Sequence, residues 1–137
     1  LGAVNAALPG CYLVPLPLSE EEHGELRAEH REQSASDELR LDAVSLAAAT
    51  EALEGLTGLA ICGQRHEKGS DISYLAARSN LDETVYLAMV VAKPHGDEGV
   101  ELELLCRASQ GEAAQELLEE LQSVLRNRLL EAGGRLA

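Results

Sequence analysis

The chain has 137 residues, neither phenylalanine nor tryptophan, and a formal net charge of -13 from 24 acidic and 11 basic side chains. This length predicts a single domain with one core, in which residues 1–10 are a linker or a remnant of a preceding unit. The acidic surface repels phosphate backbones and anionic lipid head groups, so we expect no nucleic-acid partner and no direct membrane binding.

The chain begins with a weak strand and an exposed helix. Residues 11–18 contain two prolines, which cannot donate to a sheet, so this run is an edge strand at best. Ser19 and Glu22 have the spacing of a capping box, which predicts a helix over about residues 20–32. This helix has few apolar anchors, and the polar run 34–37 is expected to end it.

A second strand and a second helix follow. Leu39 and Leu41 alternate with charged residues, the pattern of a half-buried strand. Ser45 can cap an alanine-rich helix over residues 46–53, and Gly55 is expected to stop it.

Four strand candidates form the middle of the chain. Residues 59–65 and 72–78 flank a polar turn at 67–70, so we expect a β-hairpin there. Residues 84–92 are almost entirely apolar, which indicates a strand covered on both faces. Residues 100–107 alternate, with Val100, Leu102, Leu104 and Cys106 pointing the same way.

The last helix has the strongest pattern. Ser109 and Glu112 have capping-box spacing, and apolar residues follow at helical spacing until Gly133: Leu117, Leu118, Leu121, Val124, Leu125 and Leu129. The element order β-α-β-α-β-β-β-β-α predicts an α+β fold, with an antiparallel sheet of about five strands flanked by helices.

Several short segments, in order, are similar to the C-terminal appendage of the beta-adaptins. They are an Ala-Ala pair before Leu53, Arg-His-Glu-Lys-Gly-Ser-Asp-Ile-Ser-Tyr at 65–74, the apolar run 84–92, Pro94, and Leu-Leu-Cys-Arg-Ala at 104–108. The resemblance runs from about Tyr12 to Asn127. It implies a TBP-like platform that binds peptides within a vesicle coat adaptor, and no enzymatic activity.

The resemblance also implies a site. In the family, the platform binds an amphipathic peptide helix against a tryptophan, a tyrosine and glutamates, with an arginine nearby. Tyr74 and Arg65 match the tyrosine and the arginine, whereas Ala28 falls where the tryptophan stands and Met89 where one glutamate stands. With Ala76 these residues form the expected peptide-binding surface, which should prefer an apolar ligand.

Partners and location follow from the same resemblance. A divergent beta chain of the fourth or fifth adaptor type would bind peptide motifs of accessory proteins and reach the other adaptor subunits through its parent chain. We expect a monomer in isolation, located in the cytoplasm and peripheral to trans-Golgi or endosomal membranes. The start at Leu1 suits a piece of a larger subunit, and the sandwich that usually precedes the platform is not evident.

Catalytic and metal chemistry are weakly indicated. Three widely spaced cysteines suggest reduced thiols rather than a disulfide framework. Cys62, His66 and Cys106 could be imagined as a zinc site or a thiol nucleophile, but they lack metal-ligand spacing and a neighbouring base. We therefore expect no metal and no cofactor.

One alternative comes from a different class. The size, acidity and element count also fit a small α+β secretion chaperone, which holds an unfolded effector along the surface of a stable dimer. Its dimeric state would distinguish it from the adaptor platform.

Overall fold

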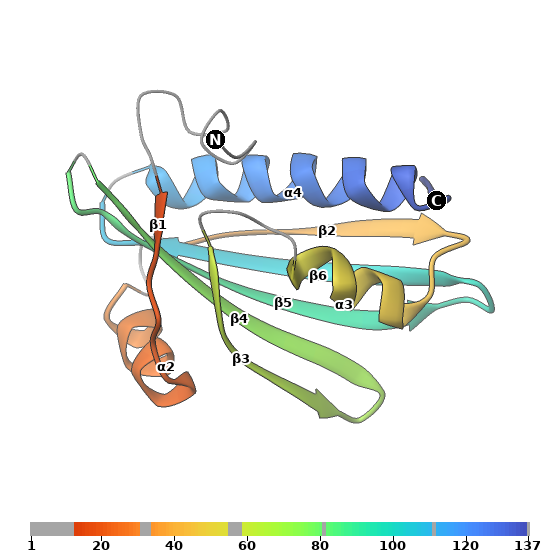
Figure 1. Cartoon of the computed structure of the whole chain (residues 1–137), viewed down its shortest axis with the longest axis horizontal. Coiled ribbons are helices and arrows are strands. Elements are labelled where there is room, and N and C mark those ends of the chain that lie inside the picture. The colour runs from red at the N-terminus through yellow and green to blue at the C-terminus, as the bar shows by residue number, and fades with distance from the viewer. Residues whose placement is uncertain (1–12, 31–33, 55–58, 81, 111, 137) are drawn as a thin grey trace.

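The computed structural model describes residues 13–30, 34–54, 59–80, 82–110 and 112–136. Within them, three helices accompany one antiparallel sheet, as expected for an α+β fold (Figure 1). In chain order the elements are β1 (Leu13–Pro15), α2 (Glu20–Glu29), β2 (Ser34–Asp42), α3 (Leu46–Glu54), β3 (Ala60–Glu67), β4 (Ser70–Ser79), β5 (Val85–His95), β6 (Gly99–Ala108), α4 (Ala113–Glu131) and β7 (Arg135–Leu136).

The described part of the sheet has the strand order β1-β4-β5-β6-β2-β7, and β3 also pairs with β4. β3 and β1 follow one another along the same edge of β4, since they pair with its first and last residues respectively. The five long strands, β2 to β6, confirm the predicted antiparallel sheet of about five. β1 and β7 are short additions at its edges.

The core lies between one face of the sheet and the helices α3 and α4. Every second residue of β6 points into it, as the alternation predicted, and α4 packs its apolar stripe against β2 and β6. Burying a leucine side chain completely contributes about 1.5–3 kcal/mol. The most deeply buried leucines of this core are Leu41, Leu75, Leu102, Leu104, Leu117, Leu125 and Leu129.

Helix α2 lies on the opposite face of the sheet. Its capping box is confirmed: the Glu22 N–H donates to Ser19 Oγ at 3.1 Å, and the Ser19 N–H donates to Glu22 Oε1 at 3.3 Å. His23 is the residue of this helix that is buried. The prediction of a mostly exposed helix is therefore confirmed, although the helix ends at Glu29 rather than near residue 32.

Two local predictions are wrong. The polar run 34–37 does not end α2; it begins β2, because Ala35 and Asp37 lie in register with Cys106 and Leu104 of β6. Ser109 does not cap α4, since its Oγ accepts the Val85 N–H at 2.9 Å and the cap residue of the helix makes no side-chain bond. In both cases, residues that the local pattern assigned to a helix end instead form hydrogen bonds within the sheet.

The other predicted helix ends and the hairpin fit their local chemistry. Ser45 Oγ accepts the Ala48 N–H at 3.1 Å, so the predicted cap of α3 is confirmed, whereas Gly55 lies outside the described residues. Lys68 and Gly69 both have positive φ, which matches a tight hairpin turn between β3 and β4. After α4, Gly133 has φ 103 and the helix stops there.

Candidate functional site

The sheet face opposite α3 and α4 is here called the open face. Antiparallel register places its side chains in rows that run across the strands. One row joins Ser36, Leu105, Met89 and Tyr74, and the next joins Glu38, Glu103, Val91 and Ile72. Helix α2 covers only the Tyr74 end of these rows. Beyond Met89, the rest of these two rows is not covered by a described helix (Figure 1).

The sequence-predicted residues gather around the border between α2 and the open face. Tyr74 and Met89 are direct cross-strand partners, and the Arg65 guanidinium lies 5.8 Å from the centre of the Tyr74 ring. Ala28 is exposed on α2, next to the residue that contacts Met89, while Ala76 on β4 is fully buried. Arg65, Met89 and Ala28 are thus accessible to a ligand at least in part.

Tyr74 lies beneath α2. Its side chain is only 8% exposed, the His23 ring meets it edge-on with 5.2 Å between centroids, and the Arg27 guanidinium lies 6.0 Å from its centre. Guanidinium groups within about 6 Å of an aromatic ring are attracted to its face. The ring therefore holds α2 on the sheet, and a ligand would reach it fully only if α2 moved.

His23 is the buried anchor of α2. Its Nε2 lies 3.0 Å from the Leu75 carbonyl oxygen, which can only accept, so Nε2 carries the proton and donates. Nδ1 is buried and has no hydrogen-bond partner among the described residues. Burial lowers the pKa of His23, and the nearby Arg27 lowers it further. The helix is thus docked by a neutral imidazole.

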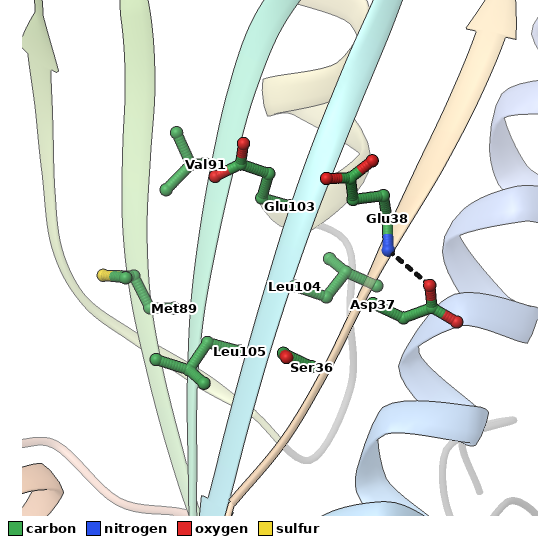
Figure 2. A pocket seen from close by; sticks show the side chains of 8 residues that line it. All are labelled: Ser36, Asp37, Glu38, Met89, Val91, Glu103, Leu104 and Leu105. Atoms are coloured by element: carbon green, nitrogen blue, oxygen red, sulfur yellow. Dashed lines mark hydrogen bonds between the residues drawn. The ribbon is translucent and has the colours of Figure 1, made fainter.

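A shallow groove of about 550 Å³ lies beside α2 on the open face (Figure 2). Its apolar floor is formed by the half-buried side chains of Met89, Val91 and Leu105. At the α2 end, Arg27 Nη1 lies 2.8 Å from Met89 Sδ, so the methionine connects the groove to the helix. At the other end stand the exposed carboxylates of Glu38 and Glu103.

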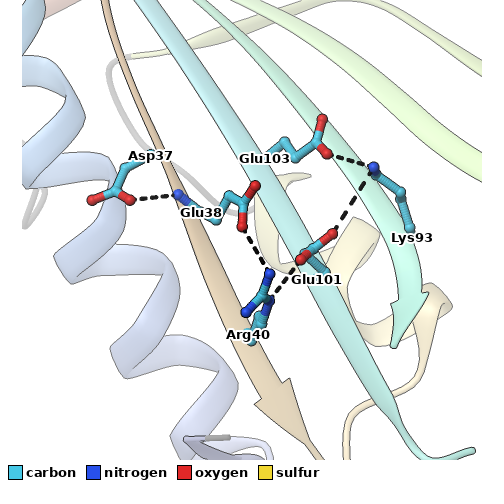
Figure 3. A network of polar contacts seen from close by, with 6 residues as sticks. All are labelled: Asp37, Glu38, Arg40, Lys93, Glu101 and Glu103. Carbon is cyan, nitrogen blue, oxygen red and sulfur yellow. Dashed lines mark hydrogen bonds and ion pairs between the residues drawn. The ribbon is translucent and has the colours of Figure 1, made fainter. Parts of the chain in front are cut away.

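Charged side chains form a network at that far end (Figure 3). Arg40 Nε contacts Glu101 Oε1 at 2.6 Å and Arg40 Nη2 contacts Glu38 Oε2 at 3.1 Å. Lys93 pairs with Glu103 and lies 3.9 Å from Glu101. The Arg40 pair lowers the pKa of Glu101, and Glu103 raises the pKa of Lys93. Arg40, Lys93 and Glu101 are therefore charged near neutral pH.

Only one of the residues that line the groove was predicted from the sequence as a site residue. Met89 was predicted from the resemblance, but Val91, Leu105, Glu38 and Glu103 were not. The alternation of residues 100–107 already indicated that Glu103 and Leu105 point away from the core. Their meeting with Val91 and Glu38 depends on the register of three strands, which no local pattern specifies.

The cysteines and His66 lie in different surroundings. Cys106 is in the core beneath α4, where burial raises the pKa of its thiol to about 12. Burial also raises the pKa of half-buried Cys62. His66 Nδ1 lies 2.6 Å from Asp71 Oδ1 near the hairpin turn. Within the described ranges, no three His, Cys, Asp or Glu side chains form a group able to hold a metal ion.

A scan against protein-family models and a search of curated proteins found no match to this chain. None of the described helices combines the length and apolar character needed to cross a bilayer.

Proposed function

We propose that this domain is a protein-interaction module whose open face binds short amphipathic peptide segments of accessory proteins. The observation that carries the proposal is the groove, where Met89, Val91 and Leu105 present adjoining half-buried side chains beside charged residues. An apolar patch with a polar rim is typical of a protein-binding surface. An amphipathic segment would bury its apolar side chains against this floor.

The setting that we propose is the appendage platform of a vesicle coat adaptor beta subunit, of the fourth or fifth type. The ordered motifs at 65–74 and 104–108 support it, and so does the clustering of Tyr74, Met89, Arg65 and Ala28 at one border of the open face. In this role the domain is a non-enzymatic recruiter in the cytoplasm. Other subunits attach it to trans-Golgi or endosomal membranes.

Peptide titration tests the proposal. Amphipathic peptides with Leu or Phe at i and i+3 or i+4 are titrated by calorimetry into wild type, Leu105→Ala and Leu130→Ala. Leu130 is the matched control because it is 38% exposed on α4, away from the groove. Truncating an anchor contact costs about 1–2 kcal/mol of binding free energy, so we expect Leu105→Ala to bind roughly tenfold more weakly than wild type. Leu130→Ala should bind with unchanged affinity. Equal loss in both variants would contradict a site in the groove.

Sizing distinguishes this proposal from a secretion chaperone. In analytical ultracentrifugation, an adaptor platform is expected to behave as a monomer, whereas such chaperones are stable dimers. A concentration-independent dimer would favour the chaperone.

A further inference from the structure

Met89 is the only methionine in the sequence, and it lies in the apolar floor of the groove. Its register partners are Tyr74 on β4 and Leu105 on β6, and its side chain is half-buried. Figure 2 shows the sulfur near the tip of this side chain, on the side of the groove away from Asp37 and Glu38. A partly exposed thioether is accessible to small oxidants, which convert it to a polar sulfoxide.

A guanidinium group lies against this sulfur. Arg27 Nη1 donates to Met89 Sδ at 2.8 Å, although a thioether sulfur is only a weak acceptor. Among the described residues, no carboxylate forms an ion pair with Arg27, even though the chain has 24 acidic side chains. An oxygen atom on the sulfur would give this half-buried donor a strong acceptor.

We propose that Met89 is a site of reversible oxidation, at which a hydroperoxide converts the thioether to a sulfoxide that Arg27 stabilises and that weakens ligand binding in the groove. This inference rests on the proposed function and names a regulation of the same site. A lone pair of Sδ attacks one oxygen of the hydroperoxide, so that an S–O bond forms and the O–O bond breaks. The sulfur loses two electrons. The hydroperoxide is reduced to water or an alcohol, which takes up the proton of the transferred oxygen.

The sulfoxide changes the groove in two ways. Its oxygen lies next to Arg27, so the contact becomes a charge-assisted hydrogen bond that holds α2 against β5. Its S–O dipole would also lie beneath the apolar side chains of a ligand, and burying a polar group there carries a desolvation cost. The floor thereby loses the adaptable apolar side chain that methionine provides. Oxidation of Met89 thus strengthens the docking of α2 and weakens binding in the groove.

The described cysteines react under different conditions. Thiols are oxidised as thiolates, whereas a thioether has no proton to lose. Burial raises the pKa of the Cys106 thiol to about 12 and also raises the pKa of Cys62. Cys11 lies outside the described residues. Treatment just below neutral pH therefore favours oxidation of Met89 over oxidation of the two described thiols.

Hydrogen peroxide is the probe in the first test. Wild type, Met89→Leu and Arg27→Leu are treated just below neutral pH, and peptide mapping by mass spectrometry locates each added oxygen. Met89→Leu is the matched control, because it keeps an apolar side chain of similar volume without the sulfur. We expect one added oxygen at Met89 in wild type. If Met89 stays reduced in the folded protein while peroxide oxidises it in urea, the inference fails.

Hydrogen exchange in α2 tests the role of Arg27 without any ligand. Each protein is compared with its own reduced form. We expect exchange in α2 to slow several-fold when wild type is oxidised, because the new hydrogen bond holds the helix. Arg27→Leu has no donor at this position, so oxidation should not slow its exchange. Faster exchange in oxidised wild type would show that the sulfoxide displaces α2, and would overturn the proposed stabilisation.

Calorimetry with an amphipathic leucine peptide measures the effect on binding after the peroxide has been removed. We expect oxidised wild type to bind about tenfold more weakly than reduced wild type, because the sulfoxide must be desolvated. Methionine sulfoxide reductases with dithiothreitol should restore the affinity, whereas dithiothreitol alone, which reduces disulfides, should not. Peroxide treatment should not change the affinity that Met89→Leu has before treatment.

The possible failures are distinguishable. Equal affinity of reduced and fully oxidised wild type, or recovery with dithiothreitol alone, overturns the inference and leaves the proposed function intact. If reduced wild type binds no amphipathic peptide, the proposed function fails and the effect of oxidation on binding fails with it. The mass and exchange measurements then still decide whether Met89 is oxidised and whether Arg27 stabilises the sulfoxide.

Discussion

The two faces of the sheet are covered in different ways. On the core face, α4 contributes a stripe of leucines with almost no exposed surface, among them Leu121, Leu125 and Leu129. On the open face, α2 contributes one buried histidine and leaves an apolar groove beside it. The core face supplies most of the stability of the fold, so the open face can keep apolar side chains available for a partner.

The largest effect that separates the two faces is expected from leucine truncation. Leu125→Ala removes a fully buried side chain from α4, and a change of this kind costs about 2–5 kcal/mol of unfolding free energy. Leu105→Ala, in the half-exposed groove, is expected to cost about 1 kcal/mol or less. Urea denaturation measures both. Similar losses of unfolding free energy in the two variants would show that the open face contributes as much to stability as the face packed against α4.

The next largest effect is expected from acid, because protonation acts on His23, the buried residue that anchors α2. Burial lowers the pKa of His23 below its ordinary value of 6.5, so the unfolded chain binds the proton first as the pH falls. The contribution of the neutral imidazole is fully present above pH 6.5 and declines as the pH drops toward the folded-state pKa. Each unit of lowering corresponds to about 1.4 kcal/mol.

Unfolding of wild type and His23→Gln at pH 7.5 and pH 5.5 measures this effect. We expect wild type to lose more stability than the variant between these two pH values. An equal loss of stability in both proteins would show that His23 does not cause the pH dependence.

A smaller effect is expected at the start of α2. Ser19→Ala removes the side-chain acceptor for the Glu22 N–H, and the loss of such a cap costs about 1 kcal/mol. Hydrogen exchange should accelerate in α2 and remain unchanged in α4. Acceleration spread over both helices would mean that α2 does not open independently of the core.

The smallest effect is a stabilisation. Gly24 lies within α2, and a Cβ added there would meet nothing within 4 Å. Gly24→Ala should therefore stabilise the helix by about 0.5–1 kcal/mol, with no new contact to the sheet. Slower hydrogen exchange in α2 checks this expectation, and a destabilised variant would contradict it.

Sequence patterns predicted the elements better than the surface they create. The leucine stripe of α4, the capping box of Ser19 and the hairpin each depend on residues close in sequence, and all three are present. Ser109 and the run 34–37 were misassigned because strand pairing determines their roles. The groove could not be predicted in the same way, since Leu105, Val91 and Glu38 meet only through the register of β2, β5 and β6.

An amide NMR titration of the domain with an amphipathic peptide shows directly whether the open face binds such a segment. We expect the largest shift changes at Met89, Val91 and Leu105 and in their neighbours on β2, with smaller changes in α2. Changes confined to α3 and α4, or to β3, would contradict it.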